Sequence, residues 1–170
     1  MKKFALILTI IMSLAVSKNA IAQGTIVDVA VGNKDFSTLV TALKAADLVG
    51  ALQGEGPFTV FAPTNDAFAK IDPNTLGSLL EEKNQKALAN ILTYHVIAGK
   101  IAATDVVSAL EKGKGTVELK ALNGQVLTVV QKDGKIWLKD LNGNYSEIVA
   151  TDVMGSNGVI HVINTVVMPN

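Results

Sequence analysis

The sequence predicts an α+β fold in which helices come first and strands come mostly later. Apolar residues recur at helical spacing in the segment that begins near Asp35, and they alternate with polar residues from Thr116 onward. Strands and helices do not alternate regularly along the chain, which argues against a parallel α/β sheet. We therefore expect one β-sheet with several helices packed along it.

The first predicted helix spans about residues 35–46. Its apolar residues fall at positions i, i+3, i+4 and i+7 and form a single stripe that should cover the sheet. These residues are Phe36, Leu39, Val40 and Leu43. A short second turn over residues 48–52 should end at Gly54 and Gly56.

A buried strand and a helix start are predicted next to each other between Phe58 and Phe68. The run from Phe58 to Phe61 is apolar-rich and typical of a strand, which we expect Pro63 to end. Thr64 can then accept a backbone hydrogen bond as an N-cap, with Asp66 placed where the helix dipole favours a carboxylate. Capping gives these polar residues a structural role rather than a binding one.

Two further helices are predicted between residues 72 and 95. Asp72 followed by Pro73 is typical of an N-cap and a first helical residue, and Asn84 is predicted to cap the next helix. That helix ends on an apolar stripe composed of Leu88, Ile91, Leu92 and His95. His95 should therefore be enclosed near the helix C-terminus, where its ring can bond a free carbonyl.

Three turn signals divide the last third of the chain into strands. They are Asn123-Gly124, Asp133-Gly134 and Asn142-Gly143. Each pair favours the tight turns that join antiparallel strands. We expect strands at residues 116–121, 126–130, 136–138, 148–153 and 159–167, with His161 enclosed in the last one.

The first 22 residues have the organisation of a secretory signal peptide. Lys2 and Lys3 precede an apolar stretch from Phe4 to Val16, and a small-x-small pattern ends at Ala22. The apolar stretch is shorter than the roughly 20 residues that span a membrane, and no second candidate follows. We expect cleavage after Ala22, one domain over residues 23–170, no integral membrane segment in the mature chain, and a secreted, periplasmic or cell-surface location.

Charge and cysteine content narrow the possible functions. The chain has no cysteine and no arginine, and its fifteen lysines balance fifteen acidic residues. Loss of residues 1–22 removes three lysines, so the mature chain has twelve lysines, fifteen acids and a net charge of −3. That acidity, without the bidentate guanidinium group that grips phosphate, disfavours a nucleic-acid partner. Stability must come from packing without disulfides.

No metal, cofactor or catalytic site is expected. Two histidines without cysteine do not make a structural zinc site, and Asp140, Asn142 and Asn144 match a calcium loop poorly because glycine comes early and Thr151 replaces its glutamate. A hairpin turn explains that loop better. The serines lack a nucleophile elbow, so a hydrolase is only a distant alternative.

Three motifs in this order resemble the fasciclin (FAS1) family. They are Phe58 to Phe68, Tyr94-His95 and Gly158 to Pro169, and the likeness extends from about Thr25 to Pro169. This resemblance implies a compact α+β module, a wedge of β-sheet with helices packed along it, of a single-domain, bacterial-type secreted kind. It also implies an adhesion protein without catalytic residues.

The resemblance further suggests two candidate binding segments. Asp152-Val153-Met154 is similar to an integrin-associated segment of vertebrate matrix members, although valine stands where isoleucine is usual, and Tyr94-His95 has a similar association. The competing interpretation of Asp152 is an acidic strand end before a turn. We also expect that replacing Asp152 by alanine leaves folding nearly intact, so that unchanged binding of this variant would argue against an adhesion role of the segment. For Tyr94 the alternative is a core ring.

Two functions remain open at the level of sequence. The first is an adhesion module that recognises an extracellular matrix protein or a cell-surface polysaccharide. The second is a structural or stress-related envelope or biofilm protein without a dedicated ligand. An exposed apolar patch would favour the first. Bridging two surfaces requires two binding faces or a weak homo-oligomer, because one monovalent site cannot bridge.

Overall fold

A computed structural model describes residues 24–170, so the predicted signal peptide and its cleavage site lie outside the described residues. The helices are α1 (Ile26–Gly32), η1 (Lys34–Phe36), α2 (Ser37–Ala45), α3 (Val49–Leu52), α4 (Asn65–Phe68), α5 (Pro73–Leu79), η2 (Glu82–Asn84), α6 (Gln85–Tyr94) and α7 (Ala103–Lys112). The strands are β1 (Phe58–Pro63), β2 (Val96–Ala98), β3 (Thr116–Lys120), β4 (Val126–Lys132), β5 (Lys135–Lys139), β6 (Tyr145–Gly155) and β7 (Gly158–Ile163). The predicted α+β class is confirmed.

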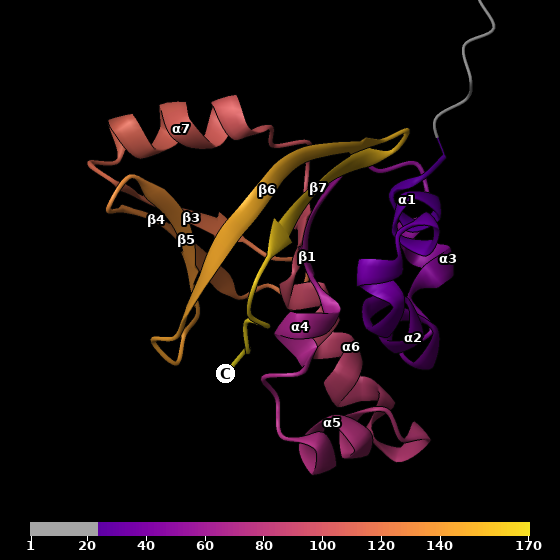
Figure 1. The fold of residues 1–170 in the computed structure, drawn as a ribbon. Helices are drawn as coiled ribbons and strands as arrows, with labels where there is room; N and C mark the ends of the chain where they lie inside the picture. The colour runs from indigo at the N-terminus through magenta and orange to yellow at the C-terminus, as the bar shows by residue number, and fades with distance from the viewer. Residues whose placement is uncertain (1–23) are drawn as a thin grey trace, which may run out of the picture.

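The strands form one seven-stranded sheet in the order β2-β1-β7-β6-β5-β4-β3 (Figure 1). Only β1 and β7 are parallel, with Phe58 opposite Gly158, and all other neighbours are antiparallel. The two edges meet where Ile97 bridges Ala121, which brings the curved sheet close to a closed barrel. Gly158 lies so near the Phe58 carbonyl that a β-carbon there would overlap it.

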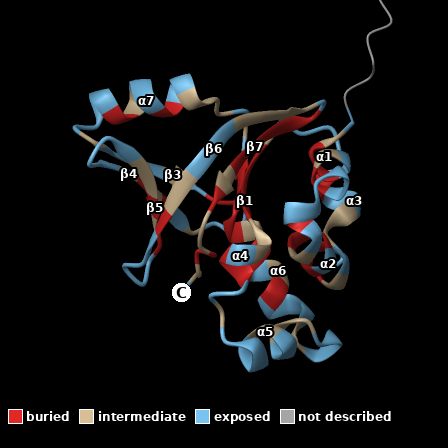
Figure 2. Ribbon diagram, viewed as in Figure 1, coloured by how far each residue is buried: buried red, intermediate tan, exposed pale blue. Residues whose placement is uncertain are grey.

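Two apolar cores hold the molecule together. The first core lies between the helices α1 to α6 and the strands β1 and β7. Most of β1 and β7 is buried and is coloured red in Figure 2. The second lies inside the curved sheet, where Val106 and Leu110 of α7 join Leu127, Leu138 and Ile163 of the strands. Helix α7 therefore covers the inner surface of the strands β3 to β5.

The first helical segment differs from the prediction in two ways. The expected helix over residues 35–46 is divided into η1 and α2, because Asn33 caps a separate 3-10 turn by accepting from the Asp35 backbone N–H. An additional helix, α1, precedes it and was not predicted. Thr25 starts α1 through a capping box with Asp28, whose carboxylate accepts from the Thr25 backbone N–H at 2.8 Å.

Two of the three predicted N-caps are confirmed. Thr64 accepts from the Ala67 backbone N–H, and Asp72 accepts from two first-turn N–H groups of α5, with Pro73 at the first helical position. Asn84 takes the predicted N-cap position of α6, but its side chain makes no hydrogen bond to the first turn. Its side-chain amide instead donates to the Ser78 carbonyl at 2.7 Å, so it joins α5 to η2. Pro63 is the last residue of β1 and ends this strand, as predicted.

The three predicted turns join the antiparallel strands. Asp133 and Gly134 both have positive φ, at 54° and 74°, as the tight turn between β4 and β5 requires. Strand β6 starts earlier and ends later than predicted, and β7 ends at Ile163 rather than at residue 167. Side chains of β3 to β6 alternate between the inner core and a surface of exposed or half-buried residues, which we call the outer face.

Candidate functional site

Tyr94 and His95 lie inside the protein at the end of α6. Tyr94 is 0% exposed, and its hydroxyl donates to the Val126 carbonyl at 2.9 Å. Burial and the Asp140 carboxylate raise the pKa of Tyr94. His95 is 2% exposed. Neither side chain is on the surface, so the expectation that this pair contacts a partner directly is corrected, while the core position predicted for His95 agrees with the structure.

Both ring nitrogens of His95 are hydrogen-bonded. Nδ1 lies 2.8 Å from the Ile91 carbonyl oxygen, and the Val167 backbone N–H donates to Nε2 at 3.2 Å. Because a carbonyl only accepts, these partners assign the proton to Nδ1 of a neutral ring. Burial lowers the pKa of His95 to about 4, against a smaller opposing effect of the Ile91 carbonyl. The neutral imidazole joins α6 to the C-terminal segment.

Asp152 connects the sheet to the start of α7. It lies in an irregular stretch of β6 with φ of 58°, a conformation that L-residues other than asparagine and aspartate seldom adopt. Its Oδ1 accepts from the Ala103 backbone N–H, at the first residue of α7, at 2.9 Å. Asp152 thus lies near the end of β6 before a turn, as its structural interpretation has it, and its carboxylate in addition satisfies a helix-terminal donor.

The rest of the Asp152-Val153-Met154 segment is half-buried. Val153 packs against the helix-side core, opposite Ile160 of β7, and Met154 lies opposite Val159. The structure thus places this segment at the far end of β6 from the buried Tyr94-His95 pair, and the two predicted binding segments do not form one surface. Only parts of Asp152, Val153 and Met154 are accessible to a partner.

His161 is enclosed in β7, as the sequence predicted. Its Nε2 lies 2.8 Å from the Ile101 carbonyl oxygen, and its ring lies 5.6 Å from that of Phe61. Thr59 of β1 completes this polar cluster by donating to Gly99 at 2.7 Å and accepting from Ile101 at 2.9 Å. The cluster holds the segment before α7 against the central strands. Sequence reasoning missed Thr59.

Asp140 organises the hairpin loop that resembled a calcium site. It is buried, and its Oδ1 accepts from the backbone N–H groups of Asn142 and Asn144 at 2.9 and 2.8 Å. Its Oδ2 accepts from the Met168 backbone at 3.2 Å. Four N–H donors in all, including the Asn144 side-chain amide, surround this carboxylate and give it a structural role. Within residues 24–170, no group of three metal-ligating side chains comes together.

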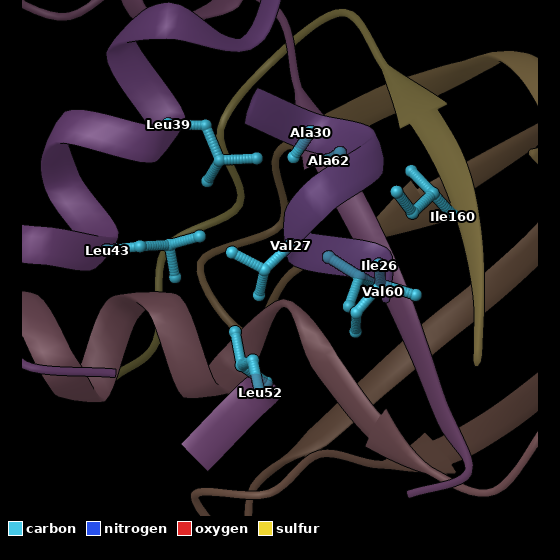
Figure 3. Close-up of a pocket in the computed structure, with 9 residues that line it drawn as sticks. All are labelled: Ile26, Val27, Ala30, Leu39, Leu43, Leu52, Val60, Ala62 and Ile160. Atoms are coloured by element: carbon cyan, nitrogen blue, oxygen red, sulfur yellow. The ribbon is translucent and has the colours of Figure 1, made fainter. Parts of the chain in front are cut away.

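The apolar cavity beneath α1 is part of the core. Figure 3 shows its lining side chains converging from α1, α2, α3, β1 and β7, among them Val27, Leu43 and Val60. Its volume of about 10 Å³ leaves room for one water molecule at most, and its apolar lining offers a water no hydrogen-bond partner. This cavity is too small to be a ligand site.

The outer face contains two aromatic residues that were not predicted to belong to a site. Trp137 of β5 is half-buried, and Tyr145 of β6 is 47% exposed. They line a surface hollow of about 200 Å³ together with Lys132 and Asp133. The signal was present in the sequence, because the single tryptophan of the chain falls on the polar side of a period-two strand.

Comparison with known proteins identifies the family. A model of the Fasciclin domain matches residues 34–169. Protein sll1483 of Synechocystis is 52% identical over 145 residues, which are 85% of this chain and 73% of that protein. The cell surface glycolipoprotein MPB83 of Mycobacterium bovis is 36% identical over 153 residues, which are 87% of this chain and 62% of that protein. The chain belongs to the fasciclin family, which confirms the resemblance.

Two longer proteins share the domain. Transforming growth factor-beta-induced protein ig-h3 of Sus scrofa is 40% identical over 147 residues, which are 86% of this chain and 20% of that protein. A FAS1 domain pair from the insect cell adhesion molecule fasciclin I superposes with a TM-score of 0.73 at 20% identity, over 84% of this chain and half of the other. This similarity confirms the fold. Of residues 24–170, no helix is long and apolar enough to cross a membrane.

Proposed function

We propose that this protein is an exported, non-catalytic adhesion module that binds an extracellular matrix protein or a cell-surface polysaccharide. Family membership supports the general class, since relatives include a cell surface glycolipoprotein and a cell adhesion molecule. The lysine-led apolar stretch before Ala22 supports export to the periplasm, the cell surface or the medium.

The main support for a binding function is the group of aromatic and apolar residues on the outer face. Trp137 and Tyr145 lie on neighbouring strands of this face, and the half-exposed Val149 continues it along β6. A domain without a dedicated ligand should expose apolar residues singly, whereas binding proteins expose them together. The gathered aromatic residues favour the adhesion module over an envelope protein of purely structural function.

The two histidines argue against a hydrolase. Each ring contacts a backbone carbonyl through one nitrogen, and the Val167 N–H occupies the other nitrogen of His95. A general base must be within reach of the proton that it removes, and these rings are buried. Their geometry suits a structural role, and no reaction needs to be assigned to them.

Asp152, Val153 and Met154 remain a second candidate contact. The Asp152 carboxylate already accepts one hydrogen bond, so a partner would use its remaining lone pairs together with the exposed parts of Val153 and Met154. Replacing Val153 by threonine keeps the β-branched shape and changes the polarity of this segment. Loss of binding in that variant, with unchanged melting temperature, would assign the segment to the contact surface.

An array experiment tests the proposed function. The processed protein is applied to immobilised matrix proteins and envelope polysaccharides, with the Tyr145→Ala variant beside it. Saturable binding of the parent chain to at least one class, weakened in the variant, is the expected result. Absence of binding to every matrix protein and polysaccharide would refute the adhesion function. Mass spectrometry of the exported chain checks removal of residues 1–22.

A further inference from the structure

We propose that the outer face binds an acidic polysaccharide, with one sugar ring seated in the hollow between Trp137 and Tyr145. This inference rests on the proposed function and names both the site and the chemical class of the partner. The side chains of this site lie on β3 to β6 and the turn at Asp133, outside the three motifs that resemble the family.

Positive charge is concentrated on this face of an acidic protein. Its charged members are Lys120, Lys132, Lys135, Lys139, Glu118 and Glu147, and Asp133 adjoins them in the turn between β4 and β5. Lys135 and Glu147 form an ion pair at 2.7 Å, whereas Lys132 has no ion pair among the described residues. The face thus has an excess of lysine although the chain after residue 22 has a net charge of −3. Complementarity favours an anionic partner.

The aromatic side chains give the same face a stacking surface. Tyr145 lies opposite Lys139 across the β5–β6 pair, and Trp137 lies opposite Glu147, so Tyr145 and Trp137 are diagonal neighbours whose backbones are about 7 to 8 Å apart. The Lys139 ammonium lies 5.9 Å from the centroid of the Tyr145 ring. With such a pair, the aromatic ring can contact the apolar face of an acidic sugar while the neighbouring ammonium group contacts the carboxylate of the same sugar.

The polar groups at the hollow are suited to a sugar ring that bears both hydroxyl groups and a carboxylate. The Asp133 carboxylate can accept from hydroxyl groups, and Lys132 can donate to a carboxylate. The Trp137 indole N–H is buried and has no acceptor among the described residues. A sugar oxygen that displaced a neighbouring side chain would satisfy this donor.

The spacing of the lysines suits an extended chain rather than a compact anion. Lys135, Trp137 and Lys139 point to the same side of β5, which places the two lysines about 13 Å apart with the indole between them. Strand β5 is paired on both sides, so it offers no free edge to a peptide strand. The absence of arginine disfavours a nucleic-acid strand.

Affinity electrophoresis in gels that contain polygalacturonate or alginate tests the proposal, with neutral dextran, poly-glutamate and oligothymidylate in parallel gels. We expect the processed chain to be retarded by the uronic acid polymers and less by the others. Tyr145→Ala should weaken this binding about fivefold to tenfold, by loss of the stacking ring, and Tyr145→Phe should retain most of it.

A pair of double variants separates the local site from net charge. Lys132→Gln with Lys139→Gln removes two charges beside the hollow and should weaken binding about tenfold or more. Lys44→Gln with Lys86→Gln removes the same charge from exposed positions on α2 and α6 and should change binding less than twofold. Circular dichroism and thermal melting confirm that each variant is folded.

The outcomes distinguish this inference from the proposed function. Binding to a matrix protein or a neutral glycan, without binding to the uronic acid polymers, would overturn the inference and leave the adhesion function intact. Absence of binding to any matrix protein or polysaccharide would overturn both. Equal retardation by poly-glutamate or oligothymidylate, or equal effects of the two lysine pairs, would mean nonspecific attraction of polyanions and would also overturn the inference.

Discussion

The two ends of strand β6 differ in what their side chains do. At the C-terminal end, the Asp152 carboxylate accepts from the first N–H of α7 and Val153 packs into the helix-side core. At the N-terminal end, Tyr145 is 47% exposed and lines an open hollow. The motif residues Tyr94 and His95 are like the C-terminal end of β6, because they too are buried and hydrogen-bonded within the protein. They hold the fold, whereas the surface available to a partner lies among residues outside the motifs.

Substitution of Tyr94 should have the largest effect on stability and would test whether the buried motif residues hold the fold. Tyr94→Ala removes a fully buried ring and leaves the Val126 carbonyl without its donor, so we expect a loss of about 3 to 5 kcal/mol in the free energy of unfolding. Tyr94→Phe keeps the ring and should lose only about 1 kcal/mol. Urea denaturation measures both. A near-parental Tyr94→Ala would disprove the core assignment.

The pH dependence of stability should reveal the buried neutral His95. Its pKa is about 4 in the folded protein and about 6.5 when unfolded, so only the unfolded chain gains a proton between these values. The stabilisation is complete above pH 6.5 and falls by about 3 kcal/mol as the pH approaches 4. Urea denaturation across this range, compared with a His95→Gln variant, measures the effect. Parallel profiles for the two proteins would contradict it.

Asp152→Ala should destabilise the protein by about 1 to 2 kcal/mol, in contrast to the prediction from sequence. The substitution leaves the Ala103 N–H without its acceptor and places alanine at a φ of 58°. Asp152→Asn keeps an acceptor and tolerates this backbone conformation, so it should retain most of the stability. Thermal melting of the three proteins measures the difference, and an unchanged alanine variant would show that the contact contributes little.

The smallest effects on stability are expected on the outer face. Tyr145→Ala and Lys132→Gln should change the free energy of unfolding by less than about 0.5 kcal/mol, because exposed side chains away from caps and cores contribute little. Both substitutions should nevertheless weaken polysaccharide binding. A large loss of stability in either variant would show that these outer-face residues also hold the fold, and the two ends of β6 would then not differ in role.

The parts of the fold that were predicted from sequence depend on local chemistry. The caps at Thr64 and Asp72 and the turn at Asp133-Gly134 require only neighbouring residues, so their patterns predicted them correctly. Helix α1 was missed because its apolar pattern is short. Asn84 takes the predicted N-cap position, but its side chain reaches Ser78, six residues away, and does not cap its own helix.

The contacts that sequence reasoning missed are distant along the chain. Asn157 lies in the turn between β6 and β7, and its side-chain amide accepts from the Ile26 backbone N–H and donates to the Leu52 and Gly54 carbonyls. The contact of Asp152 with Ala103 is another case, 49 residues apart. No local pattern encodes such pairs. The outer face was missed because its residues lie on different strands, and only the register brings Trp137 and Tyr145 together.

The parallel pairing of β1 with β7 has a consequence for the order of folding. Phe58 lies opposite Gly158, so these two neighbouring strands are about 100 residues apart in the chain. Such a pairing requires closure of a long loop, which slows folding, and the sheet cannot be completed until the C-terminal strand is present. A chain built in this way stays incompletely folded while it is synthesised, and such a delay is compatible with the export that we propose, because a secretory channel passes unfolded chains.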